Sequence, residues 1–189
     1  MTQISDAPRI RNGVNVDTMF GTLDAIKATP TLATFQWRAS NKWMGGSHNR
    51  SSIKVFYGAG GDDTTRSHGW DIDAGEPGIL LGKDEGPNPA EFLLHALAAC
   101  LTTSLVYVCS ARGVELESVE STIEGDMDVQ GALGLNNEVR NGFKAIRVKF
   151  NVVSSAPQEK IDECVRRAYA RSAVFDSITQ GVPVSVTLG

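Results

Sequence analysis

Cysteine is scarce in this chain, and none of it is spaced for a metal site. The 189 residues include three cysteines, Cys100, Cys109 and Cys164, with no CxxC pair among them. An odd number of cysteines cannot all pair within one chain, so the sequence favours reduced thiols and a cytoplasmic protein. The N-terminal stretch also lacks the apolar run of a secretory signal peptide, which points the same way.

Motifs of metal sites and of serine hydrolases are missing as well. The three histidines, His48, His68 and His95, are scattered, and none belongs to an HxxxH or ExxH pair. No GxSxG motif is present to place a nucleophilic serine, so a Ser-His-Asp hydrolase is disfavoured. We therefore expect neither a metal nor any other cofactor.

Basic side chains form no stripe or patch along the sequence. Lysine and arginine number 18 against 22 acidic residues, which gives a formal net charge of −4 with both signs interspersed. Proteins that bind nucleic acid neutralise its phosphates with clustered basic residues. The sequence therefore predicts no nucleic-acid partner.

One segment is long and apolar enough to raise the question of a membrane. Residues 92–111 contain no Asp, Glu, Lys or Arg, and a span of roughly 20 apolar residues is what a bilayer requires. The segment nevertheless carries two cysteines, two threonines and two serines, and it stands alone between charged, alternating stretches. Because a completely buried central helix is also apolar on all sides, we expect such a helix and no membrane partner.

The periodicity of apolar residues predicts an α+β fold. Antiparallel strands with segregated helices define this class, and a homodimer in which two copies of the long helix pack together would cover that helix. Asp17 is expected to cap the first helix. Helices are predicted at residues 17–28, 89–112, 157–172 and 174–178, and strands at 32–38, 52–57, 114–129, 143–153 and 182–188.

Cys100, in the middle of the long predicted helix, is the first candidate for chemistry. A free cysteine on a buried helix commonly packs as a small hydrophobic residue. Reactivity requires the thiolate, which a nearby cation or a helix N-terminus stabilises. Because Cys100 lies in mid-helix, that stabilising group must come from elsewhere in the fold. Cys109 and Cys164 lie in segments without features of interest and are predicted to be packing residues.

A dense polar segment, residues 41–50 (NKWMGGSHNR), is predicted to be a hairpin loop. An ordinary polar loop is one interpretation. The functional alternative is a loop that carries Arg50 to a reactive site, where a guanidinium can hold a thiolate or a peroxide oxygen by charge-assisted hydrogen bonds. The residues alone leave both interpretations open.

Residues 86–103 (GPNPAEFLLHALAACLTT) resemble the helix motif of the OsmC/Ohr family, the osmotically inducible and organic hydroperoxide resistance proteins. Gly125-Asp126 with Gly131, then residues 171–178 (RSAVFDSI) and the final PVSV, continue the resemblance in the expected order. The resemblance begins at about residue 32. It therefore suggests an N-terminal arm and short helix over residues 1–30, followed by an OsmC-like domain over residues 31–189.

The resemblance implies a fold and an activity. The fold would be an intertwined homodimer, in which antiparallel sheets wrap around long central helices. The activity would be that of a thiol peroxidase that reduces organic hydroperoxides in oxidative-stress defence, with Cys100 as the peroxidatic cysteine. The activating arginine maps to the hairpin region, where Arg50 is the first choice and Arg38 the second.

Further residues are candidates for the pocket that the resemblance implies. They are His48, His95 and Ser172. His95 is expected to satisfy a buried hydrogen bond rather than to line the pocket, because neutral histidine is commonly accommodated in cores.

Two positions depart from the family pattern. The second family cysteine would stand where this chain has Ser172, and serine cannot form a disulfide. Cys164, about two helical turns earlier, is an imperfect substitute. The usual catalytic glutamate position is Ala90. The neighbouring Glu91 is the available carboxylate, although nine residues before Cys100 it should face the opposite side of a continuous helix.

Three functions remain open at this point. The expected one is a one-cysteine hydroperoxide reductase that an external thiol recycles. The alternatives are a non-catalytic protein that binds an apolar small molecule in the interfacial pocket, and a different thiol-dependent enzyme that acts on an electrophile. Fold alone does not decide among them.

Overall fold

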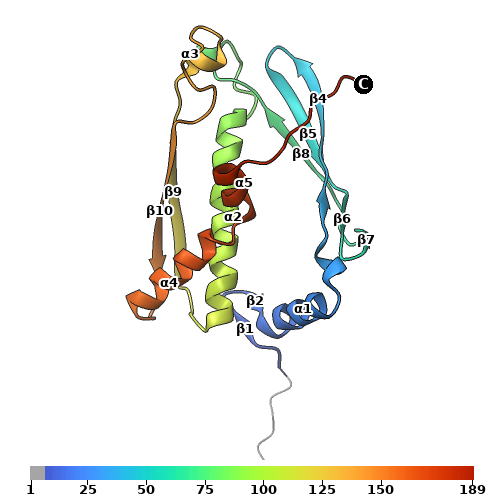
Figure 1. Ribbon diagram of the computed structural model, residues 1–189, viewed down its shortest axis with the longest axis vertical. Coiled ribbons are helices and arrows are strands. Elements are labelled where there is room, and N and C mark those ends of the chain that lie inside the picture. Colours follow the sequence, from blue (N-terminus) through green and yellow to red (C-terminus); the bar gives the residue numbers. More distant parts are fainter. Residues whose placement is uncertain (1–6) are drawn as a thin grey trace, which may run out of the picture. The chain divides into compact units, whose positions relative to one another are not determined.

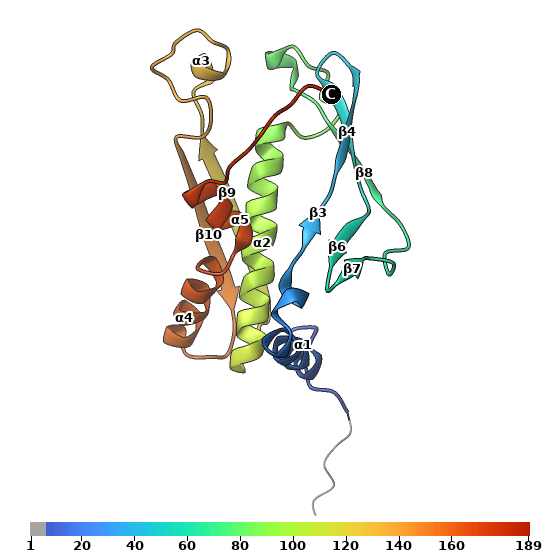
Figure 2. The ribbon, with the colours of Figure 1, turned by 45° about the vertical axis from the view of Figure 1, so that its right-hand side comes forward.

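The computed structural model describes residues 7–189 and shows an α+β fold of helices and antiparallel sheets (Figures 1 and 2). The predicted fold class is therefore confirmed. The described residues form two compact units. One comprises residues 7–9 and 15–92, and the other comprises residues 10–14 and 93–189. The predicted division between an arm at residues 1–30 and a family domain at residues 31–189 stays a prediction. Residues 1–6 of that arm lie outside the described part.

The first unit begins with helix α1, Val16–Ala28. Its N-cap is Asn15, whose side chain accepts a hydrogen bond from the Thr18 amide at 2.9 Å. The prediction that Asp17 caps this helix was wrong, because the Asp17 carboxylate instead accepts hydrogen bonds from the backbone and guanidinium of Arg9. The helix ends at Thr29, as the following Pro30 predicted.

Two small sheets follow in the first unit. Strand β3 (Gln36–Trp37) pairs with β6 (Phe56–Gly58), which pairs with β7 (Gly61–Asp62). The other sheet has the order β4-β5-β8, with β4 at Ser40–Gly45, β5 at His48–Ile53 and β8 at Trp70–Ala74. Two short 3-10 helices, Pro30–Ala33 and Gly78–Leu80, lie outside the sheets.

The strand predictions in this unit were only partly right. The predicted pairing of residues 32–38 with 52–57 survives as two residue pairs between β3 and β6. The predicted loop at residues 41–50 is itself the β4–β5 hairpin, which a polar sequence conceals because neither strand has an apolar face. The start of the predicted strand at residue 32 is a 3-10 turn, since Pro30 favours a helical turn there.

Helix α2 runs from Pro89 to Arg112, as predicted. It begins with a reciprocal cap, in which the Asn88 side chain accepts from the Glu91 amide and the Glu91 carboxylate accepts from the Asn88 amide, both at 2.8 Å. It ends at Gly113, which has a φ of 76°, and the Gly113 and Val114 amides donate to the carbonyls of Ser110 and Cys109. These two bonds form a Schellman motif, which explains the need for glycine at this position.

A β-hairpin and a second helix pack on α2 in the second unit. Strands β9 (Ser118–Asp126) and β10 (Ala145–Val153) pair in antiparallel register over nine residue pairs, and α4 spans Gln158–Tyr169. Figures 1 and 2 both show the hairpin and α4 beside α2. The buried core consists of Leu105, Val108, Cys109, Val114, Cys164 and Ala168, and the hairpin packs against it through Val119, Phe150 and Val152.

The segment of residues 10–14 belongs to the second unit because it holds the end of α2. It contains most of the short hairpin of β1 (Ile10–Arg11) and β2 (Val14–Asn15). The Arg11 guanidinium donates to the Ser110 carbonyl at 2.8 Å. The Asn12 side chain bonds Ser110 Oγ and the Val114 carbonyl, and accepts from the Leu116 amide. These bonds satisfy carbonyl groups that a helix end leaves free.

The chain closes with helix α5, Ala173–Gln180, and residues 181–189 form no strand in the described part. The prediction of a strand at residues 182–188 was therefore wrong for the single chain. Its apolar side chains are exposed, with Val186 at 92% and Leu188 at 102% of full accessibility. A strand needs a partner edge for its backbone groups, and this segment has none among residues 7–189.

The turn between β9 and β10 contains the short helix α3, Val129–Ala132.

Helix α2 is long and apolar enough to cross a membrane by length and composition, but a core helix of a soluble protein passes the same test. The expectation that it is covered on every side is not met within one chain. Only 28% of its most apolar 18-residue window is buried. The buried side chains are Leu97, Leu101, Leu105, Val108, Cys109 and Ser110.

Candidate active site around Cys100

Cys100 meets the beginning of α5 at its sulfur. It lies on α2 and is partly exposed. The hydroxyl of Ser172, the N-cap of α5, donates a hydrogen bond to Cys100 Sγ with an oxygen-to-sulfur distance of 3.1 Å. Ser172 is only 1% exposed, so water does not compete for this hydroxyl. A hydrogen-bond donor to the Cys100 sulfur therefore comes from 72 residues later in the chain.

The surroundings of the sulfur favour the thiolate. Burial raises the pKa of Cys100, but hydrogen bonds from Ser172, from the Val174 and Ala173 amides and from Ser104 lower it, and the net pKa lies below the ordinary value. The two amides belong to the first turn of α5, where backbone N–H groups are free and the helix dipole is positive. Such an environment is typical of a reactive cysteine.

The other two cysteines are in a different environment. Cys109 and Cys164 are fully buried in the core and unpaired within residues 7–189. Burial, together with the adjacent Cys164 thiol, raises the pKa of Cys109 to about 12. This thiol is therefore inert at neutral pH, as the sequence predicted for a packing residue.

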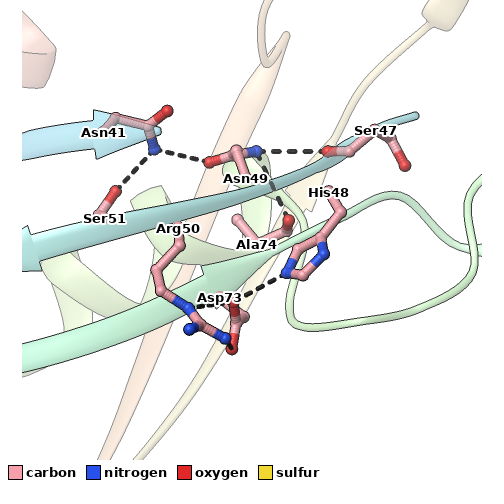
Figure 3. A network of polar contacts seen from close by, with 8 residues as sticks. All are labelled: Asn41, Ser47, His48, Asn49, Arg50, Ser51, Asp73 and Ala74. Carbon is pink, nitrogen blue, oxygen red and sulfur yellow. Dashed lines mark hydrogen bonds and ion pairs between the residues drawn. The ribbon is translucent and has the colours of Figure 1, made fainter. Parts of the chain in front are cut away.

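Arg50, the first choice for the activating arginine, is bound to a carboxylate in the first unit (Figure 3). Its guanidinium donates to Asp73 from Nε at 2.8 Å and from a terminal nitrogen at 3.0 Å. His48 Nε2 lies 2.8 Å from the same carboxylate. These bonds, from Arg50 first and His48 second, hold the pKa of Asp73 at about 2.

Side-chain amides of two neighbouring asparagines also link strands of this sheet by hydrogen bonds. Asn41 donates to Asn49 and Ser51, and Asn49 donates to the carbonyls of Ser47 and Ala74 (Figure 3). Together with the Arg50–Asp73 pair these contacts link β4, β5 and β8. The polar residues of segment 41–50 thus stabilise the small sheet, in agreement with the interpretation of an ordinary polar segment. The segment is, however, a hairpin rather than a loop.

Arg38, Glu91 and His95 are the remaining predicted site residues. Arg38 bonds the Gln36 side chain and pairs with Asp62 at 3.0 Å. Glu91 uses its carboxylate to cap α2. His95 is exposed, so the expectation that it satisfies a buried hydrogen bond was wrong. Of the predicted residues, the structure brings together Cys100 with Ser172, and His48 with Arg50.

Sequence reasoning missed the amides of Ala173 and Val174, Ser104 and Asp73. Ser104 stands four residues after Cys100, a spacing that places both on one face of α2 and that could have identified it. The amides could not be found from residue type, because any amino acid except proline supplies one. Among residues 7–189, no three His, Cys, Asp or Glu side chains are grouped to hold a metal ion.

Comparison with solved structures supports the fold of the chain. An OsmC-like protein from Mycoplasma pneumoniae aligns with a TM-score of 0.59 at 15% identity, over 78% of this chain and 89% of that one. An organic hydroperoxide resistance protein from Legionella pneumophila aligns with a TM-score of 0.52 at 18% identity, over 77% and 91%. An OsmC-like protein of unknown function from Vibrio cholerae gives 0.55 at 13%, over 76% and 94%. At these identities the likeness shows the fold alone.

Sequence comparison identifies the family. No curated protein matches the chain at a significant level. The family model for OsmC-like proteins matches residues 82–187, which is more than half of the chain and includes both Cys100 and Ser172. The resemblance seen in the sequence is therefore confirmed, and the chain belongs to the family of OsmC-like proteins.

Proposed function

We propose that this protein is a one-cysteine peroxidase that reduces organic hydroperoxides in the cytoplasm, with Cys100 as the peroxidatic residue. The observation that carries the proposal is the partly exposed Cys100 sulfur held by Ser172 and the first turn of α5, with its pKa lowered. A thiolate that is both accessible and stabilised is the nucleophile that such chemistry needs. The family supports the proposal, since a structural neighbour is named an organic hydroperoxide resistance protein.

The first step transfers one oxygen atom. The Cys100 thiolate attacks the terminal oxygen of the hydroperoxide, the O–O bond breaks, and the alkoxide takes up a proton and leaves as an alcohol. Cys100 is oxidised to the sulfenic acid, and the hydroperoxide is reduced. The Ser172 hydroxyl donates to the sulfur, and the Ala173 and Val174 amides also lower its pKa, so these groups favour its negative charge.

An external thiol completes the cycle. It attacks the Cys100 sulfenic acid to give a mixed disulfide and water, and a second thiol releases Cys100 as the thiolate with formation of an external disulfide. The side chain in contact with the Cys100 sulfur from α5 is the hydroxyl of Ser172, which cannot form a disulfide. Cys109 and Cys164 are fully buried and are unsuited to this role.

We further propose that the working form is a homodimer. The apolar helix α2 leaves most of its surface uncovered within one chain, and residues 182–188 leave their valine and leucine side chains exposed. Exposed apolar surface of this extent marks an interaction site. A second copy would cover these surfaces, and Arg50 or Arg38, each paired with an aspartate in one chain, remains a candidate to activate the peroxide in the assembly.

Hydroperoxide consumption tests the proposed activity. Purified protein is mixed with cumene hydroperoxide and an excess of a small thiol, and the remaining hydroperoxide is measured over time. The protein should turn over, Cys100→Ser should not, and Cys164→Ala should retain the wild-type rate, since its thiol lies in the core. Equal consumption by the protein and by Cys100→Ser would refute the proposal. Absence of turnover, with tight binding of apolar ligands in both proteins, would favour a binding protein.

A further inference from the structure

We propose that Ser172 is a positioning residue that holds the sulfur of Cys100 in its reactive orientation. This inference rests on the proposed function, because it assigns a role within the same site.

The backbone of Ser172 is fixed on both sides. Its amide donates to the Tyr169 carbonyl at the end of α4, and its carbonyl accepts from the Asp176 amide at 3.0 Å in α5. The rings of Tyr169 and Phe175, on either side of the corner, lie 5.7 Å apart between centroids. The α4–α5 corner therefore presents the Ser172 side chain in one direction.

The hydroxyl of Ser172 has a single hydrogen, and the structure accounts for its use. The oxygen accepts a hydrogen bond from the Phe175 amide at 3.2 Å, which caps α5. The O–H donates to Cys100 Sγ, with 3.1 Å between the oxygen and the sulfur. The cap uses an acceptor lone pair of the oxygen, so the O–H remains available to donate to the sulfur. The cap and the thiol contact therefore depend on the same atom, and the cap orients the donor.

The groups known to act on this sulfur are uncharged. Among the described residues, those that shift the pKa of Cys100 are the Ser172 and Ser104 hydroxyls and the Ala173 and Val174 amides. Ser172 is the donor whose side chain is seen in contact with the sulfur, at 3.1 Å, and it is almost completely buried.

Alkylation of Cys100 tests this role separately from peroxide chemistry. The rate of reaction with iodoacetamide is measured by mass spectrometry from pH 5 to 10.5 for the protein and for Ser172→Ala, Ser172→Thr and Ser172→Asp. Threonine keeps both the cap and the donor. Aspartate keeps a cap acceptor but replaces the donor with a negative charge. Ser177→Ala is the matched control, because Ser177 lies on the same helix and bonds the Ala173 carbonyl instead of the sulfur.

The expected results separate a positioning role from a structural one. At pH 7 the alkylation rate should fall on the order of 10-fold in Ser172→Ala, from loss of one hydrogen bond to a charged group. It should fall further in Ser172→Asp and stay at the wild-type value in Ser172→Thr and Ser177→Ala. The profiles of the slowed variants should shift to higher pH.

Two outcomes would overturn the inference. One is a Ser172→Asp profile that overlies that of the parent, which would mean that only the cap matters. The other is a folded Ser172→Thr that reacts as slowly as Ser172→Ala; if Ser172→Ala fails to fold, Ser172→Thr is compared with the parent. Failure of the peroxidase proposal would be seen differently, as Cys100 that alkylates with the expected profiles but does not reduce hydroperoxide.

Discussion

Replacing Ser172 by cysteine should convert the site into one that forms an internal disulfide. The Ser172 oxygen lies 3.1 Å from Cys100 Sγ, so a sulfur at the same position is within reach of the oxidised Cys100. After one hydroperoxide has oxidised Cys100 to the sulfenic acid, the introduced thiol attacks that sulfur, the S–O bond breaks, and water leaves. After one hydroperoxide per chain the variant should therefore end as a disulfide, without any external thiol, where the parent ends as a sulfenic acid.

The new bond should also stabilise the fold. It would join residues 72 apart in the sequence, and the loop-closure relation for a disulfide then gives about 4 kcal/mol in the free energy of unfolding at 25 °C. Strain in the native state reduces this value, so oxidised Ser172→Cys should be more stable than its reduced form by about 2 to 4 kcal/mol.

The assay combines mass spectrometry with urea unfolding. One equivalent of cumene hydroperoxide should lower the mass of Ser172→Cys by the two hydrogens of the disulfide, and the midpoint of unfolding should rise. Ser177→Cys, with a thiol elsewhere on α5, is the control and should form no bond to Cys100. If Ser172→Cys keeps a free thiol at position 172 while Cys100 is oxidised, the contact between α2 and α5 is wrong.

Three further changes test other parts of the structure. Cys164→Ser places a hydroxyl in the fully buried core and should lower the free energy of unfolding by about 1 to 3 kcal/mol, measured in urea, with no change in Cys100 alkylation; an equally stable variant would contradict the core. The pKa of Asp73 is lowered from 3.8 to about 2, so its stabilising contribution is complete above about pH 4 and is lost as the pH falls towards 2. Asp73→Asn should be less stable than the protein at pH 6, and the difference should shrink across that window; a difference independent of pH would refute the pairing with Arg50. A Cβ at Gly86 would lie 2.3 Å from the Asp73 carbonyl oxygen, whereas a Cβ at Gly61 would meet nothing within 4 Å. Gly86→Ala should therefore lower the free energy of unfolding by about 1 to 3 kcal/mol, and Gly61→Ala should lower it less. Equal losses would contradict the close approach of Gly86 to the Asp73 carbonyl.

Local signals in the sequence predicted the elements that local interactions determine. The bounds of α2 followed from Pro89, a first-turn acid and Gly113, because caps lie within a few residues of the helix ends. The β9–β10 hairpin followed from alternation. The β4–β5 hairpin was missed because cross-strand hydrogen bonds between polar side chains, such as Asn41 with Asn49, replace the apolar pattern that identifies strands.

The site was predictable only in part, because its contacts join residues that are far apart in the sequence. Cys100 was found from its place on an apolar helix and from the family motif. That Ser172 donates to its sulfur could not be read from either segment, since the contact joins residues far apart in sequence. The carboxylate partner of Arg50 was missed for the same reason, because Asp73 comes from another strand 23 residues away.

Oxidation of Cys100 by an organic hydroperoxide is the most direct measurement of the central claim. The reduced protein is mixed with one equivalent of cumene hydroperoxide in the presence of dimedone, and the modified residue is located by mass spectrometry, with Cys100→Ser as the control. We predict rapid, stoichiometric trapping of a sulfenic acid at Cys100 and none in the variant. Oxidation of Cys100 no faster than that of a free thiol in solution would contradict the account.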